Sequence, residues 1–424
     1  MPGVDRIGAT LETIPTELKL MIADHFDPDV PLDLRWSQME QHEAQSRRPT
    51  LASLSLVSRS WAAVLGGLRW QSLHIRASDT VRLLELARDY MPRYGAKVKT
   101  LLFTWWTVVD LENLDRLDGT PHIQQSLNAL ECFTGLRDPS EASILRMVRL
   151  HDALIATILR ACPNLLGLKA RPETTAARYL SKYDDGEVAI SPGRTKDALY
   201  QIGRGIRRAD LSRVQNCRSA LKYLEMTPNI ELLSIRAHAK SSLFDMRHLV
   251  QTLSGMPQLF SLEFDSVHPT ALEILSALPC SKMTQMVLSG TLGPQLQNLS
   301  DALKIHPITS LSLRDWSPSD GPPPSSRPQD LNVQNLSIAG RSASVLLDLF
   351  DAAPLKHVEL CACRGSRNSN RINPNRITAF IKKHRATLLS FKIDRAILAP
   401  SVDVSVINRS LEEEGISVRV VTVG

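Results

Sequence analysis

Aromatic side chains, long apolar runs and clustered cysteines are all scarce in this sequence of 424 residues. Aromatic residues make up 5% of the chain. The longest apolar run without a charge covers residues 101–109, far short of the roughly 20 residues that cross a bilayer. Residues 1–6 also lack the apolar stretch of a secretory signal. We therefore expect no membrane partner, and a location in the cytoplasm, the nucleus or both.

The six cysteines show no spacing typical of a disulfide framework. They lie at positions 132, 162, 217, 280, 361 and 363. In a reducing compartment such scattered cysteines are most simply small buried apolar residues. We expect them to pack in the core rather than to form bridges.

The chain also has only a small excess of positive charge. Fifty Lys and Arg residues stand against 44 Asp and Glu residues, a net charge of +6. Two stretches, residues 203–213 and 364–385, are locally basic, but neither contains the interleaved aromatics typical of single-strand nucleic-acid binding. The sequence therefore favours a solvated surface or an acidic protein partner there, and makes nucleic acid an unlikely partner.

A short apolar pattern recurs through the second half of the chain. Its form is apolar-x-x-apolar-x-apolar, and its central residues are Leu233, Leu262, Met286, Leu311, Leu336, Val358 and Phe391. Successive centres lie 29, 24, 25, 25, 22 and 33 residues apart, and leucine-rich repeats have periods of about 20–29 residues. Weaker copies occur at Leu73, Leu101, Leu168 and residues 206–211, and residues 416–423 read as a last strand.

Helical patterns lie between these strand-like segments, as at residues 271–278, 345–350 and 377–384. A strand and a helix in each unit predict an α/β fold: an irregular leucine-rich-repeat solenoid with parallel strands inside and helices outside. The alternative is an ordinary α/β domain whose strands are unrelated. Three stretches interrupt the pattern: added helices near 110–161, a mobile excursion near 171–204, and a Pro- and Ser-rich loop at 317–328.

The first 75 residues differ from the rest. We expect a flexible tail at 1–12, then a helix that opens at Pro15, with Leu18, Met21 and Ile22 on one apolar face. A second helix is predicted across residues 51–68, after a polar insertion at 27–49.

These residues resemble an F-box. The family pattern is Leu-Pro-x-Glu-Leu-x-x-x-Ile followed by Leu-x-x-Val-Ser/Cys-Arg/Lys-x-Trp. The residues of this chain at or beside the pattern are Ile14, Pro15, Glu17, Leu18, Met21, Ile22, Leu54, Val57, Arg59 and Trp61. Insertions such as 27–49 occur in fungal F-box proteins, which the whole chain resembles in style.

The resemblance implies a non-catalytic adaptor in the ubiquitin pathway that leads to proteasomal degradation. An F-box module at 13–75 would dock on a Skp-type adaptor, and through it on a cullin, with the ten residues above as the contact surface. The repeats at 76–424 would bind a protein substrate. One alternative is that the apolar residues of the module simply pack against the first repeat. Another is a leucine-rich interaction scaffold without a ubiquitin-ligase connection.

The residues that flank the central apolar positions are predicted to face the opposite, concave side of the strands. This surface is polar and of mixed charge, which suits a protein partner. Its candidate substrate-binding residues are Arg236, Glu263, Asp265, Arg314, Asn335, His357, Glu359, Lys392 and Asp394.

No catalytic motif and no cofactor motif is present. His357, Glu359, Cys361 and Cys363 alternate along one strand, but alternate residues of a strand are about 6.6 Å apart, too far for a tetrahedral zinc site without a kink. We predict neither a metal site nor an enzyme.

Overall fold

The computed structural model describes most of the chain between residue 70 and the C-terminus. The described residues are 70–104, 106, 108–137, 142–171, 193–211, 217–236, 243–265, 282–289, 299, 303–314, 331–339, 347–362, 372–398 and 402–423, with 15, 16, 18, 19, 53, 56 and 58–68 near the N-terminus. The predicted insertion at 27–49, the predicted loop at 317–328 and the predicted helix at 271–278 lie outside the described residues.

Twelve short strands form a sheet whose order follows the order of the chain. Every strand pair whose register is described is parallel. The strands are β1 Ser72–Arg76, β2 Thr100–Thr104, β3 Gly167–Arg171, β4 Arg208–Leu211, β5 Leu232–Arg236, β6 Ser261–Asp265, β7 Gln285–Ser289, β8 Ser310–Arg314, β9 Asn335–Ala339, β10 His357–Cys361, β11 Ser390–Asp394 and β12 Val420–Val423.

The register of the sheet confirms the repeated apolar pattern. The predicted central residues pair in one unbroken row from Leu233 through Leu311 to Phe391. The second and fourth residues of these strands, from Leu233 and Ile235 to Phe391 and Ile393, are all buried. Each strand therefore contributes two apolar side chains to a continuous core, as stacked α/β units require.

The chain divides into two compact units, Met1–Arg208 and Ala209–Gly424. In the first, the helices are α3 Arg59–Leu68, α4 Thr80–Glu85, α5 Met91–Tyr94, α6 Val108–Arg116, α7 Pro121–Thr134, α8 Ser143–Arg160 and α10 Gly193–Gly203, with a π-helical turn at Leu86–Tyr90. In the second they are α11 Cys217–Met226, α12 Leu243–Ser254, α16 Pro374–Lys383 and α17 Val404–Glu413. None of the helices within the described ranges is long and apolar enough to cross a membrane.

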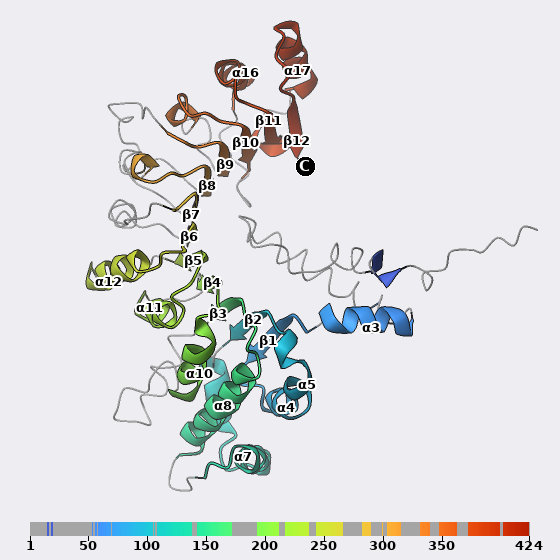
Figure 1. Cartoon of the computed structure of the whole chain (residues 1–424), viewed down its shortest axis with the longest axis vertical. Helices are drawn as coiled ribbons and strands as arrows, with labels where there is room; N and C mark the ends of the chain where they lie inside the picture. The colour runs from blue at the N-terminus through green and yellow to red at the C-terminus, as the bar shows by residue number, and fades with distance from the viewer. Residues whose placement is uncertain are drawn as a thin grey trace, which may run out of the picture. The chain divides into compact units, whose positions relative to one another are not determined.

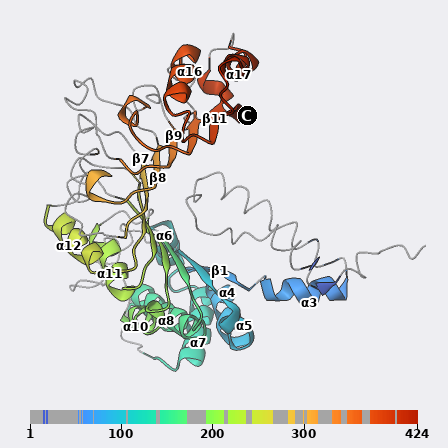
Figure 2. The ribbon, with the colours of Figure 1, turned by 45° about the horizontal axis from the view of Figure 1, so that its top comes forward.

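Helix α8 organises the first unit. It is one of the added helices predicted near residues 110–161, and most of its side chains are buried, including Asp152. The Asp152 carboxylate accepts hydrogen bonds from the backbone N–H groups of Arg194 and Thr195, at 3.0 and 2.8 Å, and so caps the first turn of α10. Figure 2 shows α8 and α10 side by side. The prediction of a mobile excursion was therefore wrong for residues 193–203, because a buried capping carboxylate holds that helix in place.

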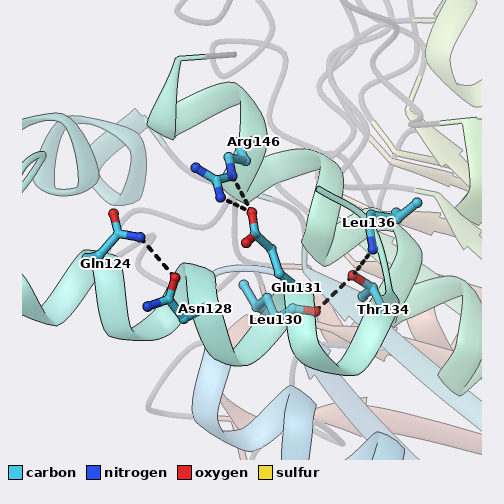
Figure 3. Close-up of polar contacts among 7 residues, drawn as sticks. All are labelled: Gln124, Asn128, Leu130, Glu131, Thr134, Leu136 and Arg146. Atoms are coloured by element: carbon cyan, nitrogen blue, oxygen red, sulfur yellow. Dashed lines mark hydrogen bonds and ion pairs between the residues drawn. The ribbon is translucent and has the colours of Figure 1, made fainter. Parts of the chain in front are cut away.

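Helices α7 and α8 are joined by a largely buried ion pair between Glu131 and Arg146 (Figure 3). Helix α7 is preceded by its N-cap, Thr120, and followed by its C-cap, Gly135, whose φ of +70° lies in the left-handed region that favours glycine. Near this end the Thr134 hydroxyl donates to the carbonyl of Leu130 at 2.8 Å. The ion pair thus joins α7 to α8, while the caps and the Thr134 hydroxyl stabilise the ends of α7.

In the second unit, helices α11, α12 and α16 lie on the same side of the strands of that unit (Figures 1 and 2). Helix α16 is linked to neighbouring segments by ion pairs on the helix side: Arg376 with Asp348, Lys383 with Asp351 at 2.6 Å, and Lys382 with Glu414 at 2.5 Å. These three cations belong to the basic stretch 364–385. Their charges are met by carboxylates of this chain, which weakens the case for a polyanionic partner there.

The described cysteines follow the prediction only in part. Cys162 is buried, and its burial raises the pKa of the thiol to about 11. Cys132, on α7, is exposed instead, because it lies on the face of that helix turned to solvent. Cys361 is half-buried at the end of β10.

Buried His151 makes the stability of the protein sensitive to acid. Burial lowers the pKa of this imidazole to about 3, whereas an unfolded chain keeps a value near 6.5. Between pH 6.5 and 3 the unfolded state therefore binds a proton that the native state does not, and stability falls as the pH falls. The expected loss is about 1.4 kcal/mol per pH unit.

We predict that His151→Gln removes about 2 kcal/mol of the stability difference between pH 7 and pH 5, measured by urea unfolding. Burial raises the pKa of neighbouring Asp152, so that carboxyl contributes in the opposite sense, but it does so in both proteins. Exposed His122→Gln is the control and should keep the wild-type slope. Equal slopes in the two variants would contradict the assignment.

Candidate functional site: the polar face of the second unit

The candidate site is the side of β5–β12 that faces away from the helices, here called the polar face. It consists of the first, third and fifth residues of β5–β11 and the second and fourth residues of β12, whose first residue pairs with the second residue of β11, because side chains alternate along a strand. The second and fourth residues are buried in β9, β10 and β11, and the others are at least partly exposed. The rule that predicted the core thus also places the predicted substrate-binding residues on one face.

Parallel register brings these residues into rows across the face. Glu263, Ser337, Glu359 and Lys392 share the row of third residues, since β6 to β11 pair in register. Asp265, Arg314 and Asp394 belong to the row of fifth residues, as does Arg236 in β5. Asn335 and His357 are first residues and pair directly. The described backbone therefore gathers all nine predicted residues on the polar face.

One ion pair crosses the face between strands that are not neighbours. Arg314 of β8 approaches Glu263 of β6 with 3.1 Å between Nη1 and Oε1, across β7. The two side chains are 24% and 19% exposed. Val287 of β7, which pairs with Glu263 in the row of third residues, is buried. The pair is therefore partly desolvated, which strengthens the attraction of its charges.

A second group of charges surrounds Cys361. Its thiol has a pKa raised to about 11, first by burial and then by the nearby carboxylates of Glu359 and Asp394. Arg314 acts on the same thiol in the opposite direction, so side chains from β8, β10 and β11 share this part of the face. A thiol with such a pKa stays protonated at neutral pH and is a poor nucleophile.

The remaining polar contacts hold the last strands of the face in place. The Asp394 carboxylate accepts from the backbone N–H of Ala362 at 3.1 Å and from that of Ala396 at 2.8 Å. His357 Nδ1 and the Ser390 hydroxyl share a hydrogen bond of 2.8 Å. In the part of the chain that the structure describes, no three His, Cys, Asp or Glu side chains are grouped closely enough to hold a metal ion. Cys363 lies outside that part.

The predicted adaptor-binding residues are described in part. Pro15 and Leu18 are exposed, and the N–H of Lys19 donates to the carbonyl of Pro15 at 3.0 Å, which closes one helical turn. This agrees with the predicted helix start. Arg59 is exposed at the first position of α3. Ile14, Glu17, Met21, Ile22, Leu54 and Val57 lie outside the described residues.

Trp61 is fully buried rather than displayed. The Lys19 ammonium lies 5.9 Å from its ring centroid and donates to the Ser60 hydroxyl at 2.5 Å. The two segments of the F-box-like pattern therefore meet in space although 41 residues separate Lys19 from Ser60. Trp61 packs inside this contact, and its place in an adaptor interface stays a prediction.

Sequence reasoning missed the pairing of Glu263 with Arg314 and the charges that surround Cys361. Each residue was a candidate by itself, but their contacts depend on side chains from strands that are not adjacent in the sequence. The sequence did contain a signal for the ion pair. Glu263 is the third residue of its strand, Arg314 is the fifth residue of the strand two repeats later, and their charges are opposite.

No model of a known protein family and no curated protein sequence matches this chain.

The Glu263–Arg314 contact gives a direct test of the polar face as described. Glu263→Gln and Arg314→Gln, made singly and together, should show a favourable coupling of about 1 kcal/mol in the free energy of unfolding, because the pair is partly buried. Exposed Arg419 and Glu412, 3.2 Å apart on the helix side, form the matched control pair and should couple by about 0.3 kcal/mol. A coupling near zero for the first pair would contradict the contact.

Proposed function

We propose that this chain is the substrate-recognition subunit of an SCF-type ubiquitin ligase, with an F-box module at 13–75 and a leucine-rich-repeat domain at 76–424. In this proposal the chain is a non-catalytic adaptor. The F-box module binds a Skp-type adaptor and through it a cullin, and the polar face binds a protein substrate.

One observation carries the adaptor half of the proposal. Leu18 is an apolar side chain at a position that the F-box resemblance assigns to the adaptor, and it is 48% exposed on the helical turn that starts at Pro15. An apolar residue left open on a short helix is suited to a partner that covers it. The contact of Lys19 with Ser60 and Trp61 supports the same proposal, since it brings the two segments of the pattern together across the 27–49 insertion.

The polar face supports the substrate half. It presents acidic, basic and hydroxyl side chains on a sheet rather than an apolar pocket, and such surfaces select partners by charge and hydrogen bonding. The protonated Cys361 thiol and the charge pairs beside it favour recognition over catalysis.

The second candidate is a leucine-rich-repeat interaction scaffold without a ubiquitin-ligase connection. The burial of Trp61 favours it, because a Trp61 packed inside the module needs no partner, as expected if the N-terminal helices only close one end of the repeats. Binding to a Skp-type adaptor separates the two candidates.

We predict that the full chain binds a purified Skp-type adaptor and that Pro15→Ala with Leu18→Ala weakens this binding about tenfold. The reason is the loss of apolar contact area worth roughly 1.4 kcal/mol. Isothermal titration calorimetry measures the affinity, and circular dichroism checks that the fold is intact.

Leu166→Ala is the matched control, since Leu166 is 43% exposed and lies outside the F-box-like pattern. It should leave adaptor binding unchanged. Failure of the wild-type chain to bind the adaptor would reject the ligase proposal and leave the scaffold.

Charge reversal on the polar face tests the substrate half. Glu263→Lys breaks the pair with Arg314 and should reduce retention of a defined set of proteins about tenfold in quantitative affinity capture with the full chain. The same reversal at Glu412, an ion-paired carboxylate of α17 outside the face, should leave that set unchanged. The double change Glu263→Lys with Arg314→Glu restores the pair with opposite polarity and should also lose the set. Identical capture by all four proteins would remove the polar face from substrate binding.

A further inference from the structure

The strands of the first unit also have a face that lies away from the core. In β1 and β2 the second and fourth residues are buried, and the first, third and fifth are at least partly exposed. Strand β3 continues the register, with Lys169 beside Leu102 of β2. This face carries His74, Arg76 and Lys169, and no Asp or Glu occurs in β1, β2 or β3. It is here called the basic strand face.

Arg208, the first residue of β4, belongs to the basic strand face as well. The backbone N–H groups of Arg207 and Arg208 donate to the carbonyl of Leu166 at 2.8 and 3.1 Å, which places Arg208 beside Gly167 of β3. A methyl group at Gly167 would lie 3.0 Å from Thr100 Cγ2 and 4.0 Å from the Cβ atom of Arg208. The side chains of Thr100 and Arg208 therefore start on the same face, and Gly167 has no side chain to separate them.

The Arg208 guanidinium is open to a partner. Arg208 is half-buried, and among the residues that the structure describes none forms a hydrogen bond or an ion pair with its side chain. Its nitrogens are not among the buried polar atoms that lack a partner, so they reach solvent. By contrast, Arg76 donates to Asp110 at 2.8 Å, and Asp210, further along β4, is itself buried. A half-buried guanidinium with five N–H donors is suited to an acceptor from outside the chain.

Lys169 lies close enough to Arg208 for both side chains to contact one anion. It is two residues beyond Gly167 along β3, whereas Arg208 is beside Gly167 on the next strand. Neighbouring strands are about 4.8 Å apart and alternate residues of one strand about 6.6 Å apart, so the two Cβ atoms are separated by about 8 Å. Both side chains are longer than half of that separation. The ammonium of Lys169 has three donors, so it can bind an added acceptor besides the contacts it already makes.

The chemistry of the face favours a carboxylate over a phosphate. Phosphate sites commonly use backbone N–H groups, whereas those of β1–β3 serve the pairing of the strands. A guanidinium binds a carboxylate through two parallel N–H bonds. On the described part of this face the imidazole of His74 is the only aromatic ring, so stacked bases of a nucleic acid find little support. Half-buried Leu102, between His74 and Lys169, offers an apolar contact of the kind a peptide can use.

We propose that the basic strand face binds an acidic segment of a partner protein, with one glutamate or aspartate carboxylate held between Arg208 and Lys169. Arg208 donates to both carboxylate oxygens, and the Lys169 ammonium adds a further charge-assisted bond. The neighbouring side chains of the segment lie against Leu102. This surface goes beyond the polar face of the second unit, and it does not depend on the ligase proposal because a scaffold would carry it equally.

The test uses the full chain and a fluorescein-labelled hexaglutamate peptide, with hexaglutamine as the neutral probe, in fluorescence anisotropy titrations. We expect hexaglutamate to bind at least tenfold more tightly than hexaglutamine. Arg208→Gln should weaken hexaglutamate binding about tenfold. Because Arg208 makes no ion pair with the described residues, this variant should fold, and circular dichroism checks it. Lys169→Gln, expected to weaken binding in the same direction, keeps the test valid if Arg208→Gln does not fold.

Arg160→Gln is the matched control. Arg160 is exposed at the last position of α8, outside the basic strand face, and its replacement removes the same charge from the same unit. It should leave hexaglutamate binding unchanged. Equal losses in the Arg208 and Arg160 variants would indicate general charge attraction and overturn the proposal, as would equal binding of the two peptides. Tighter binding of labelled oligothymidylate than of hexaglutamate, lost in Arg208→Gln, would assign the face to nucleic acid and overturn it too.

Discussion

The stacking of apolar side chains from one parallel strand onto the next is the interaction on which the rest of this structure depends. The row from Leu233 to Phe391 is continuous because each strand pairs in register with the one that follows it in the chain. With a side-chain period of two, a slip of one residue would place these leucines on the polar side. The register therefore decides at once which residues form the core and which residues a partner can meet.

The same constraint explains why the polar face is a site of recognition rather than of catalysis in our proposal. In-register pairing sets charged residues of different repeats side by side, as with Arg314, Glu359 and Asp394 around Cys361. Burial and then the carboxylates of Glu359 and Asp394 raise the pKa of the thiol, whereas Arg314 lowers it. A surface of this kind discriminates among partners by charge pattern, whereas the protonated thiol has little reactivity.

The first unit uses the strand ends differently. Its helices α7 and α8 are joined through Glu131 and Arg146, and buried Asp152 of α8 caps α10. Residues of α6 and α7 and Met147 of α8 line a cleft with Trp106 at the carboxyl ends of β1 and β2.

Sequence periodicity alone was enough for the strands, the core and the direction of the polar residues, because burial at alternate positions is a local property of each strand. Capping and helix signals likewise sufficed for α8, α16 and the helical turn at Pro15. They did not suffice for α10, whose N-terminus depends on Asp152 from another helix, or for Cys132, whose exposure depends on how α7 packs. The Glu263–Arg314 pair and the buried Trp106 indole were decided only by the tertiary structure. The pair joins residues from separate strands, and the burial of the indole depends on the elements that pack around it. Both therefore follow from packing in space rather than from spacing along the chain.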